Sequence, residues 1–143
     1  MPAAWIVSNA LTLGLIVICW RRPKVGRAII GLGFAAAAVF NAWTVLADPQ
    51  AYVRGFGPQA LFPFYENFIY GPFAKDPALF VLPIALGQLV IGLLMFARGA
   101  WLRLGLVGGT IFFLAITPLG QGSGFPMPLL GVAALWVLWH RSR

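Results

Sequence analysis

The sequence predicts an all-α, polytopic bundle of five membrane-spanning helices, and three observations carry this prediction. Of the 143 residues, 61% are hydrophobic and only 9% are charged, whereas about a quarter of the residues of a soluble domain are charged. The apolar residues gather in five long runs, and the basic residues fall in short clusters between them. A soluble fold of this size has too much surface to bury so many apolar side chains. Lipid is the solvent that fits this composition, so we expect one transmembrane domain over 1–143.

The five apolar runs set the expected spans, because a helix needs roughly 20 apolar residues to cross a bilayer. The predicted spans are residues 3–20, 28–47, 77–97, 100–117 and 127–139. Basic residues follow the first run and none precedes it, which differs from a cleavable signal peptide. The fifth run would cover only about 20 Å as a helix, so whether it crosses the bilayer fully stays open.

The distribution of charge predicts an orientation. With five spans, one side receives eight basic residues and no acidic residue: Arg21, Arg22, Lys24, Arg27, Arg98, Arg103, Arg141 and Arg143. The other side receives Arg54 and Lys75 together with Asp48, Glu66 and Asp76. Because basic loops stay in the cytoplasm, we expect a protein of the inner (plasma) membrane with its N-terminus outside and its C-terminus inside. The same topology accounts for the net charge of +7, so we expect no nucleic-acid partner.

The two loops expected on the outer side differ in composition. The connection over 48–76 contains four prolines, three glycines and eight aromatic residues, which excludes a long helix. We expect short helical segments there, which form either an interfacial collar or a surface that binds a partner protein. The segment 118–128 is uncharged and rich in glycine and proline, and it is expected to turn on the outer surface or to dip into the bundle.

Small residues spaced four apart predict faces where helices approach closely. Gly105 and Gly109 form one such pair, and Gly31 with Ala35 and Gly33 with Ala37 form two more. Such faces let two backbones come together in lipid. We expect these contacts to lie within the chain, although the pattern also fits contacts with a second chain.

Residues that carry chemistry are scarce. The predicted spans contain no Asp, Glu or Lys, and the most notable polar side chains in them are the amides of Asn41 and Gln88. These amides are candidates for a polar intramembrane contact, either with each other, with helix carbonyls or with a ligand. A single histidine, His140, and a single cysteine, Cys19, do not supply a metal site. We therefore assign no catalytic residue, no metal ligand and no recognisable cofactor ligand, and we expect no catalytic activity of the chain on its own.

A resemblance to a known family rests on short motifs spread over about 28–140. The motifs are Gly31-Leu32-Gly33-Phe34, Asp48-Pro49, Phe62-Pro63-Phe64-Tyr65, Asp76-Pro77-Ala78-Leu79-Phe80, Leu86 to Leu94, and Arg98 to Arg103 leading into Leu104-Gly105-Leu106. Their order resembles the DoxX-like family of small bacterial membrane proteins. The resemblance implies a core of four helices, to which the first span is an addition. Members of that family often carry an acidic residue where Gln88 stands, and the family is associated with membrane redox assemblies, including a thiosulfate:quinone oxidoreductase subunit.

Three functions stay open on the sequence. The leading hypothesis is a non-catalytic accessory or scaffold subunit of a larger electron-transfer complex, with membrane lipids and other membrane protein subunits as partners. The alternative is the membrane subunit of a quinone-linked oxidoreductase, since a quinone needs only an apolar cleft and a few hydrogen-bond donors. Four residues could supply these donors: Asn41, Gln88, Tyr65 and Tyr70. The third function is a small-solute carrier or channel.

Overall fold

The computed structural model describes residues 3–117 and 127–141, and these residues form helices and turns without any strand. The long helices of this part are α1 (Ala3–Arg21), α2 (Pro23–Ala47), α5 (Pro77–Leu94), α6 (Ala100–Ile116) and α7 (Met127–Arg141). The short ones are α3 (Ala51–Phe56), the 3-10 helix η1 (Gly57–Gln59), α4 (Pro63–Phe68) and the π-helical turn η2 (Ile69–Phe73). The predicted all-α class is confirmed for the described residues. Of the predicted turn over 118–128, residues 118–126 lie outside the described residues, and residues 127 and 128 belong to α7.

The long helices match the predicted apolar runs, except that α5 ends at Leu94 rather than at residue 97 and that α2 starts earlier than its run. This helix begins at Pro23 rather than at residue 28, so Lys24 and Arg27 are helical. Proline suits the first helical position, because its fixed φ matches the helix and its missing N–H would have had no helical partner. Among the helices of residues 3–117 and 127–141, only α2 and α5 are long and apolar enough to cross a membrane, whereas α1 and α6 are shorter apolar helices. Five crossings therefore stay a prediction.

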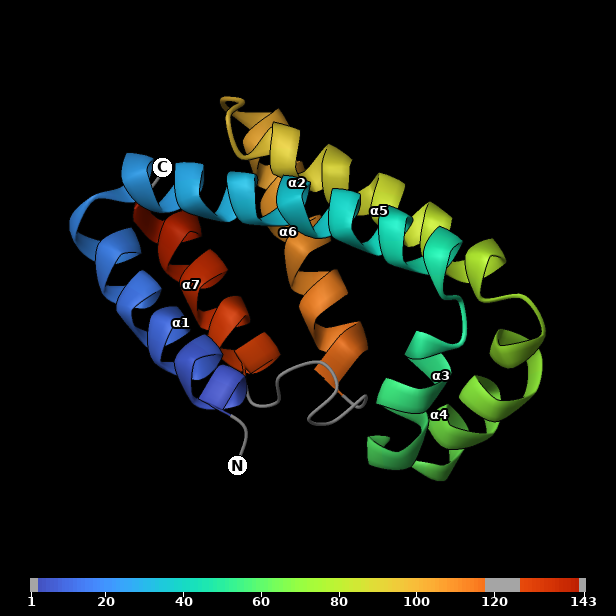
Figure 1. Ribbon diagram of the computed structural model, residues 1–143. Helices are drawn as coiled ribbons and strands as arrows, with labels where there is room; N and C mark the ends of the chain where they lie inside the picture. Colours follow the sequence, from blue (N-terminus) through green and yellow to red (C-terminus); the bar gives the residue numbers. More distant parts are fainter. Residues whose placement is uncertain (1–2, 118–126, 142–143) are drawn as a thin grey trace.

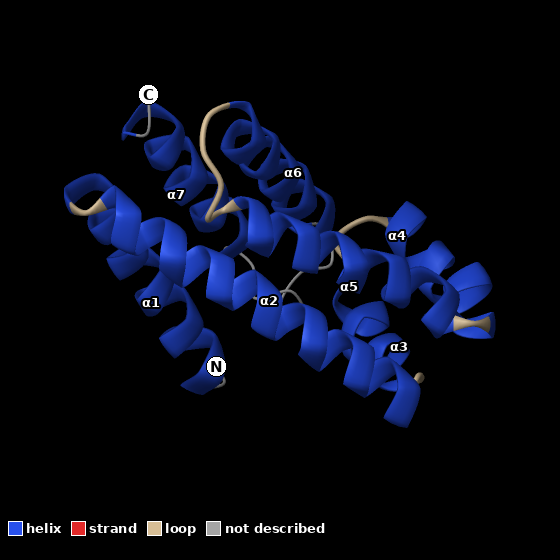
Figure 2. Ribbon diagram, turned by 90° about the horizontal axis from the view of Figure 1, so that it is seen from above, coloured by secondary structure: helices blue, strands red, loops and turns tan. Residues whose placement is uncertain are grey.

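Two helices form the spine of the molecule, and the other long helices pack below it. α2 and α5 run side by side in opposite directions, as Figures 1 and 2 show. α7 packs between α1 and α6, and the pair α1 and α7 descends from one end of the spine (Figure 1). α3 and α4 lie below the other end of the spine. A space therefore remains below the spine. α1 and α7 bound it at one end, and the short helices α3 and α4 bound it at the other (Figure 1).

Close helix approach depends on glycines at three crossings. A Cβ atom at Gly31 would lie 2.9 Å from the carbonyl oxygen of Gly92, and one at Gly92 would lie 2.8 Å from the carbonyl oxygen of Gly31. Cβ atoms at Gly105 and Gly109 would meet Leu94 and Leu135 at 2.7 and 2.9 Å. Three of the predicted small-residue positions are therefore contacts within the chain.

Gly33 differs from these three glycines, because a Cβ atom there would meet nothing within 4 Å. Its face of α2 is turned to a cavity and not to a neighbouring helix.

Two apolar clusters hold the elements together. The larger lies among α1, α2, α6 and α7, and its buried members include Cys19, Phe34, Met95, Leu106, Leu135 and Leu138. The Phe34 ring packs on Phe112 and Phe113, with centroids 5.6 and 5.4 Å away. The smaller cluster joins α2 and α5 to the short helices through Val45, Ile69, Phe73 and Val81. Cys19 is a fully buried free thiol of this cluster.

The connection over 48–76 folds into short helical segments, as predicted. Pro63 begins α4 and Pro77 begins α5, where each proline occupies a position that needs no helical N–H. The Asp76 side chain caps α5 by accepting a hydrogen bond from the Leu79 backbone N–H at 3.4 Å. These segments close the far end of the space below the spine.

Candidate functional site: an apolar cavity with one polar wall

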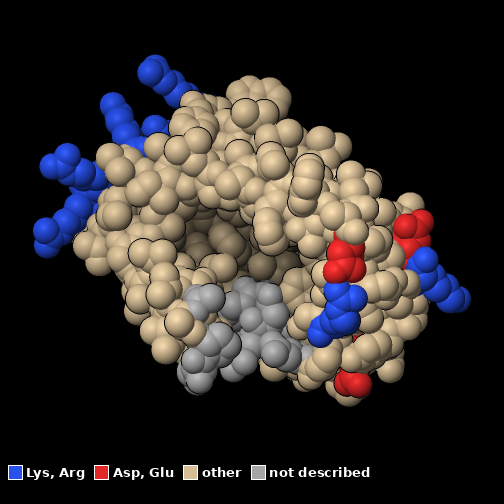
Figure 3. All heavy atoms as spheres, viewed as in Figure 1, with Lys and Arg blue, Asp and Glu red and all other residues tan. Residues whose placement is uncertain are grey.

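A large cavity lies below the spine, and it is the candidate site. Its volume is about 930 Å³, and residues of α1 to α7 and of η2 line it. Figure 3 shows the hollow in the middle of the face that Figure 1 presents. Most of the lining is aliphatic or aromatic, including Ile30, Phe34, Phe56, Phe68, Phe73, Phe80, Val81, Phe112, Phe113 and Ile116. A cavity of this size and character suits an apolar molecule of drug size or larger.

The two predicted amides meet in the wall of this cavity. Asn41 comes from α2 and Gln88 from α5, and the Asn41 Nδ2 donates a hydrogen bond to the Gln88 Oε1 at 2.9 Å. The Gln88 side chain is 3% exposed. The sequence left open whether these amides bond to each other, to helix carbonyls or to a ligand. In the structure they bond to each other.

A third residue, which the sequence did not single out, completes the network. The Tyr52 hydroxyl of α3 donates to the Asn41 Oδ1 at 2.8 Å and lies 3.1 Å from the Asn41 carbonyl oxygen. Tyr52 is eleven residues from Asn41 and on a different helix, so no periodicity in the sequence pairs them. Burial raises the pKa of Tyr52 above its ordinary value, although a hydrogen bond with Thr44 lowers it in part. The phenol is therefore protonated at neutral pH and acts as a donor.

Among residues 3–117 and 127–141, the donors and acceptors of this network leave the side-chain nitrogen of Gln88 without an acceptor. The phenol of Tyr52 donates to the Asn41 carbonyl group, and the Asn41 amide nitrogen donates to the Gln88 carbonyl group. The Gln88 Nε2 then carries N–H groups that no side chain or backbone group accepts within the described residues. Because Gln88 lines the cavity, the network offers a hydrogen-bond donor to a molecule bound there.

The structure separates the two other predicted donors. Tyr65 of α4 lines the cavity, and its hydroxyl donates to the Ala115 carbonyl oxygen of α6 at 2.8 Å. This bond ties a short helix to the end of α6 and so closes part of the wall. Tyr70 does not line the cavity, and its ring packs on Gly57 of η1, where a Cβ atom would lie 2.5 Å from the Tyr70 Cζ.

The chemistry available in the cavity is recognition through shape and one hydrogen bond. Its described lining contains no Asp, Glu, His, Cys, Lys or Arg. Elsewhere in residues 3–117 and 127–141, no three His, Cys, Asp or Glu side chains come together as a metal site would require. His140 packs on Trp136 in the last turn of α7, with ring centroids 4.3 Å apart.

Comparison with known proteins gives no relative on which to carry a function over. No family model, no curated protein and no solved structure matches this chain. The DoxX-like resemblance is therefore neither supported nor contradicted, and the function rests on the site itself.

Proposed function

We propose that this chain is a multi-pass membrane protein that binds a quinone-class molecule in the apolar cavity, as the membrane subunit of an electron-transfer assembly. The observation that carries the proposal is the Gln88 amide, which presents an unpaired N–H donor in the wall of an otherwise apolar cavity of about 930 Å³. A quinone is a flat apolar ring with carbonyl acceptors at its edge, so it satisfies both properties.

Residence in a membrane is supported by the side chains that the long helices expose. In the most apolar 18-residue stretch of α2 and of α5, only 28% of the residues are buried inside the molecule. A core helix of a soluble protein would be mostly buried. Large apolar side chains point outward instead, among them Leu11, Phe40 and Trp43, whose exposed fractions are 69%, 67% and 75%. Such a surface suits lipid and not water.

The positions of the charges support the proposed orientation. Lys and Arg side chains gather at one end of the molecule (Figure 3). The C-termini of α1, α5 and α7 and the N-termini of α2 and α6 lie there. The opposite end carries the acidic residues Asp48, Glu66 and Asp76. Five crossings of the inner membrane, with the N-terminus outside and the C-terminus in the cytoplasm, place the basic end on the side that the positive-inside rule requires. The resemblance to the DoxX-like family agrees with this arrangement and with a redox setting.

Quinone binding is tested by removing the Gln88 donor while keeping the volume of the side chain. In Gln88→Met, the affinity for decylubiquinone is expected to fall by about tenfold, because a hydrogen bond contributes about 1 kcal/mol or slightly more. Binding is measured by fluorescence quenching with the purified chain in lipid nanodiscs. Decylbenzene, which lacks carbonyl groups, should bind both proteins equally.

The matched control is Gln50→Met. Gln50 is exposed and donates its Nε2 to the Ala74 carbonyl oxygen, away from the cavity lining. This variant should bind decylubiquinone as the wild type does. Equal affinity of wild type and Gln88→Met for the quinone, or equal affinity of the wild type for quinone and decylbenzene, would contradict the proposal.

A second candidate, the non-catalytic accessory or scaffold subunit, is favoured by a different observation. Leu61 and Phe62 before α4 and Phe64 in its first turn are exposed, and Phe64 is 78% exposed. An apolar tip of this kind either lies in the membrane interface or contacts another subunit. If the chain purified in mild detergent migrates alone, with no co-purifying protein, the accessory role is contradicted and quinone binding is not.

A further inference from the structure

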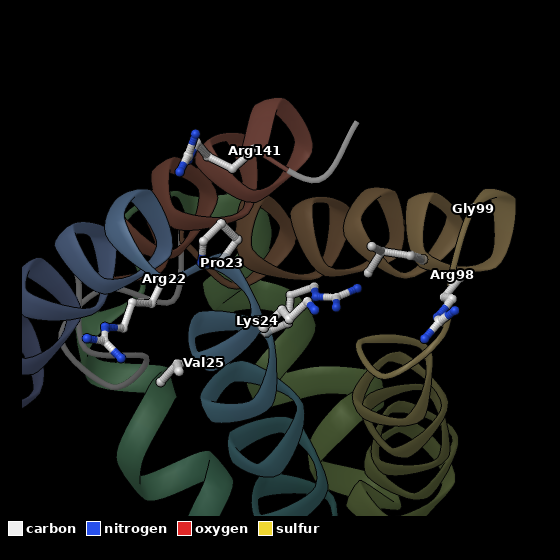
Figure 4. A pocket seen from close by; sticks show the side chains of 9 residues that line it. Arg22, Pro23, Lys24, Val25, Arg98, Gly99 and Arg141 are labelled. Atoms are coloured by element: carbon white, nitrogen blue, oxygen red, sulfur yellow. The ribbon is translucent and has the colours of Figure 1, made fainter.

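A second cavity lies at the basic end, on the other side of the fold from the Tyr52 network. Its volume is about 730 Å³, and five of its nine lining residues are cationic: Arg22, Lys24, Arg27, Arg98 and Arg141. They come from the turn between α1 and α2, the start of α2, the turn between α5 and α6, and the end of α7. Figure 4 shows Arg22 and Arg141 on one side of Lys24 and Arg98 on the other. Three separate parts of the chain thus bring cations around one space.

Within the described residues, these cations have no acidic side chain beside them. Among the described residues, the acidic side chains are Asp48, Glu66 and Asp76, and they lie on or next to the ends of helices at the opposite end of the molecule. The described part of the chain places no carboxylate in the lining of this cavity. Mutual repulsion of five cations is unfavourable unless an anion offsets it.

Arg27 of α2 is the partly buried cation of this group, so its charge is the one least exposed to water. Its Nη1 donates to the Ala97 carbonyl oxygen at 3.3 Å, which ties the start of α2 to the turn after α5. Its Nε is buried and has no acceptor among the described residues. The positive-inside rule alone does not explain the burial of Arg27 or the gathering of five cations around one cavity. Hydrated cations in separate loops would orient the chain equally well.

Aromatic residues place the cavity at the height of lipid headgroups. Trp20 lies in the last turn of α1 and Trp101 in the first turn of α6, both next to the basic turns, and their exposed fractions are 58% and 65%. Tryptophan settles at the boundary between headgroups and acyl chains. Arg141 is fixed at this level, because its Nε donates to the Trp20 carbonyl oxygen at 2.7 Å and its guanidinium lies 5.4 Å from the centre of the Trp20 ring.

We propose that the basic cavity binds the phosphate of an anionic lipid headgroup, with Arg22, Lys24 and Arg98 as the charges that contact it. Guanidinium and ammonium groups are the donors that recognise phosphate in proteins. Basic pockets between helices at a membrane surface hold anionic headgroups through this chemistry. The site does not depend on quinone binding, since the two cavities share no lining residue.

The test compares two double variants that remove the same charge. Arg22→Gln with Arg98→Gln changes two exposed lining residues whose side chains make no hydrogen bond to a described residue. Arg21→Gln with Arg103→Gln changes two basic residues of the same end that do not line the cavity. Each full-length protein is titrated with dioleoylphosphatidylglycerol or dioleoylphosphatidylcholine in detergent, and bound lipid is counted by native mass spectrometry. Helical content by circular dichroism checks that the variants fold.

The expected result is saturable binding of the anionic lipid to the wild type and much weaker binding of the zwitterionic one. The cavity pair should lose roughly fivefold in affinity for each removed charge. The control pair should lose at most about twofold, because charges in water are screened over about 10 Å. Equal losses in the two pairs, or equal binding of the two lipids by the wild type, would overturn the proposal.

Inorganic phosphate distinguishes the source of the anion. If millimolar phosphate leaves the lipid bound, the phosphate recognised is that of a headgroup held in place by its acyl chains. If phosphate displaces the lipid at that concentration, the cavity is a site for the free anion and the lipid assignment is wrong.

Discussion

Asn41 is the central residue of the hydrogen-bond network in the candidate site. Its side-chain oxygen accepts from Tyr52 and its side-chain nitrogen donates to Gln88, so one short amide joins α3, α2 and α5. A buried amide without partners is costly, and here the cost is avoided by hydrogen bonds that run in one direction. The consequence of that direction is the donor that Gln88 presents to the cavity.

The pairing of the two amides makes a prediction at this scale. Asn41→Leu and Gln88→Leu are each expected to lower the free energy of unfolding by about 1 to 3 kcal/mol, since each leaves the other amide with a lost partner. The double variant should be less destabilised than the sum of the two, with a coupling of about 0.6 kcal/mol and at most about 1.7 kcal/mol. Reversible unfolding in mixed micelles measures all four proteins. Strictly additive losses would show that the hydrogen bond contributes nothing.

Sequence reasoning found part of this network. Asn41 and Gln88 stand out because they are amides in apolar runs, and their pairing follows from two neighbouring antiparallel helices. Tyr52 was missed, because it belongs to a connection whose path depends on tertiary packing. Tyr70, which the sequence offered as a candidate hydrogen-bond donor, does not line the cavity, because the direction of a ring in an irregular segment depends on how the segment folds.

At the scale of elements, the crossing of α2 and α5 depends on Gly31 and Gly92. Each glycine faces the backbone of the other helix, and a methyl group at either position would lie within 3 Å of a carbonyl oxygen. A backbone atom cannot move aside as the end of a flexible side chain can. The two helices that form the spine would have to separate to admit a Cβ atom.

Gly92→Ala is therefore expected to destabilise the fold by about 1 to 3 kcal/mol, the cost of overpacking a close contact. Gly87→Ala lies on the same helix, where a Cβ atom would meet nothing within 4 Å. This control should be neutral or should stabilise by up to about 1 kcal/mol, because alanine favours a helix over glycine. Thermal unfolding followed by circular dichroism compares the two, and a loss in Gly87→Ala equal to that in Gly92→Ala would contradict the explanation.

The helices themselves were the most predictable part of the molecule. Long apolar runs bounded by charges or by proline and glycine leave little freedom, and α5, α6 and α7 begin at the residues expected, 77, 100 and 127. The apolar run over 28–47 predicts only the membrane-spanning part of α2, and the helix begins five residues earlier, at Pro23. Lys24 and Arg27 favour helical structure, and only the apolar stretch begins after them. The cavities were not predictable, since a volume between elements has no signature along a chain.

At the scale of the whole molecule, the dominant feature is the separation of charge. Seven of the described basic residues lie at one end, and the described acidic residues lie at the other, where Arg54 pairs with Asp48 (Figure 3). The five long helices alternate in direction between these ends. Both facts agree with the alternation of a five-span topology.

The proposed orientation is tested by labelling single cysteines. Cys19 is buried and is first replaced by serine, after which Lys24→Cys, Arg98→Cys and Lys75→Cys are made one at a time. A membrane-impermeant maleimide should label positions 24 and 98 only from the cytoplasmic face and position 75 only from outside. Labelling of positions 24 and 98 from opposite faces would contradict the five-span model, and so would labelling of positions 24 and 75 from the same face.

The separation of charge also gives the molecule a large electric moment along its long helices. In the orientation proposed above, a cell interior that is electrically negative would pull the arginine-rich end inward. Inverting the inserted chain against 100 mV would cost about 2.3 kcal/mol for every unit of net charge carried across. Respiring membranes would thus hold this protein in a single orientation, and loss of the voltage would remove part of that restraint.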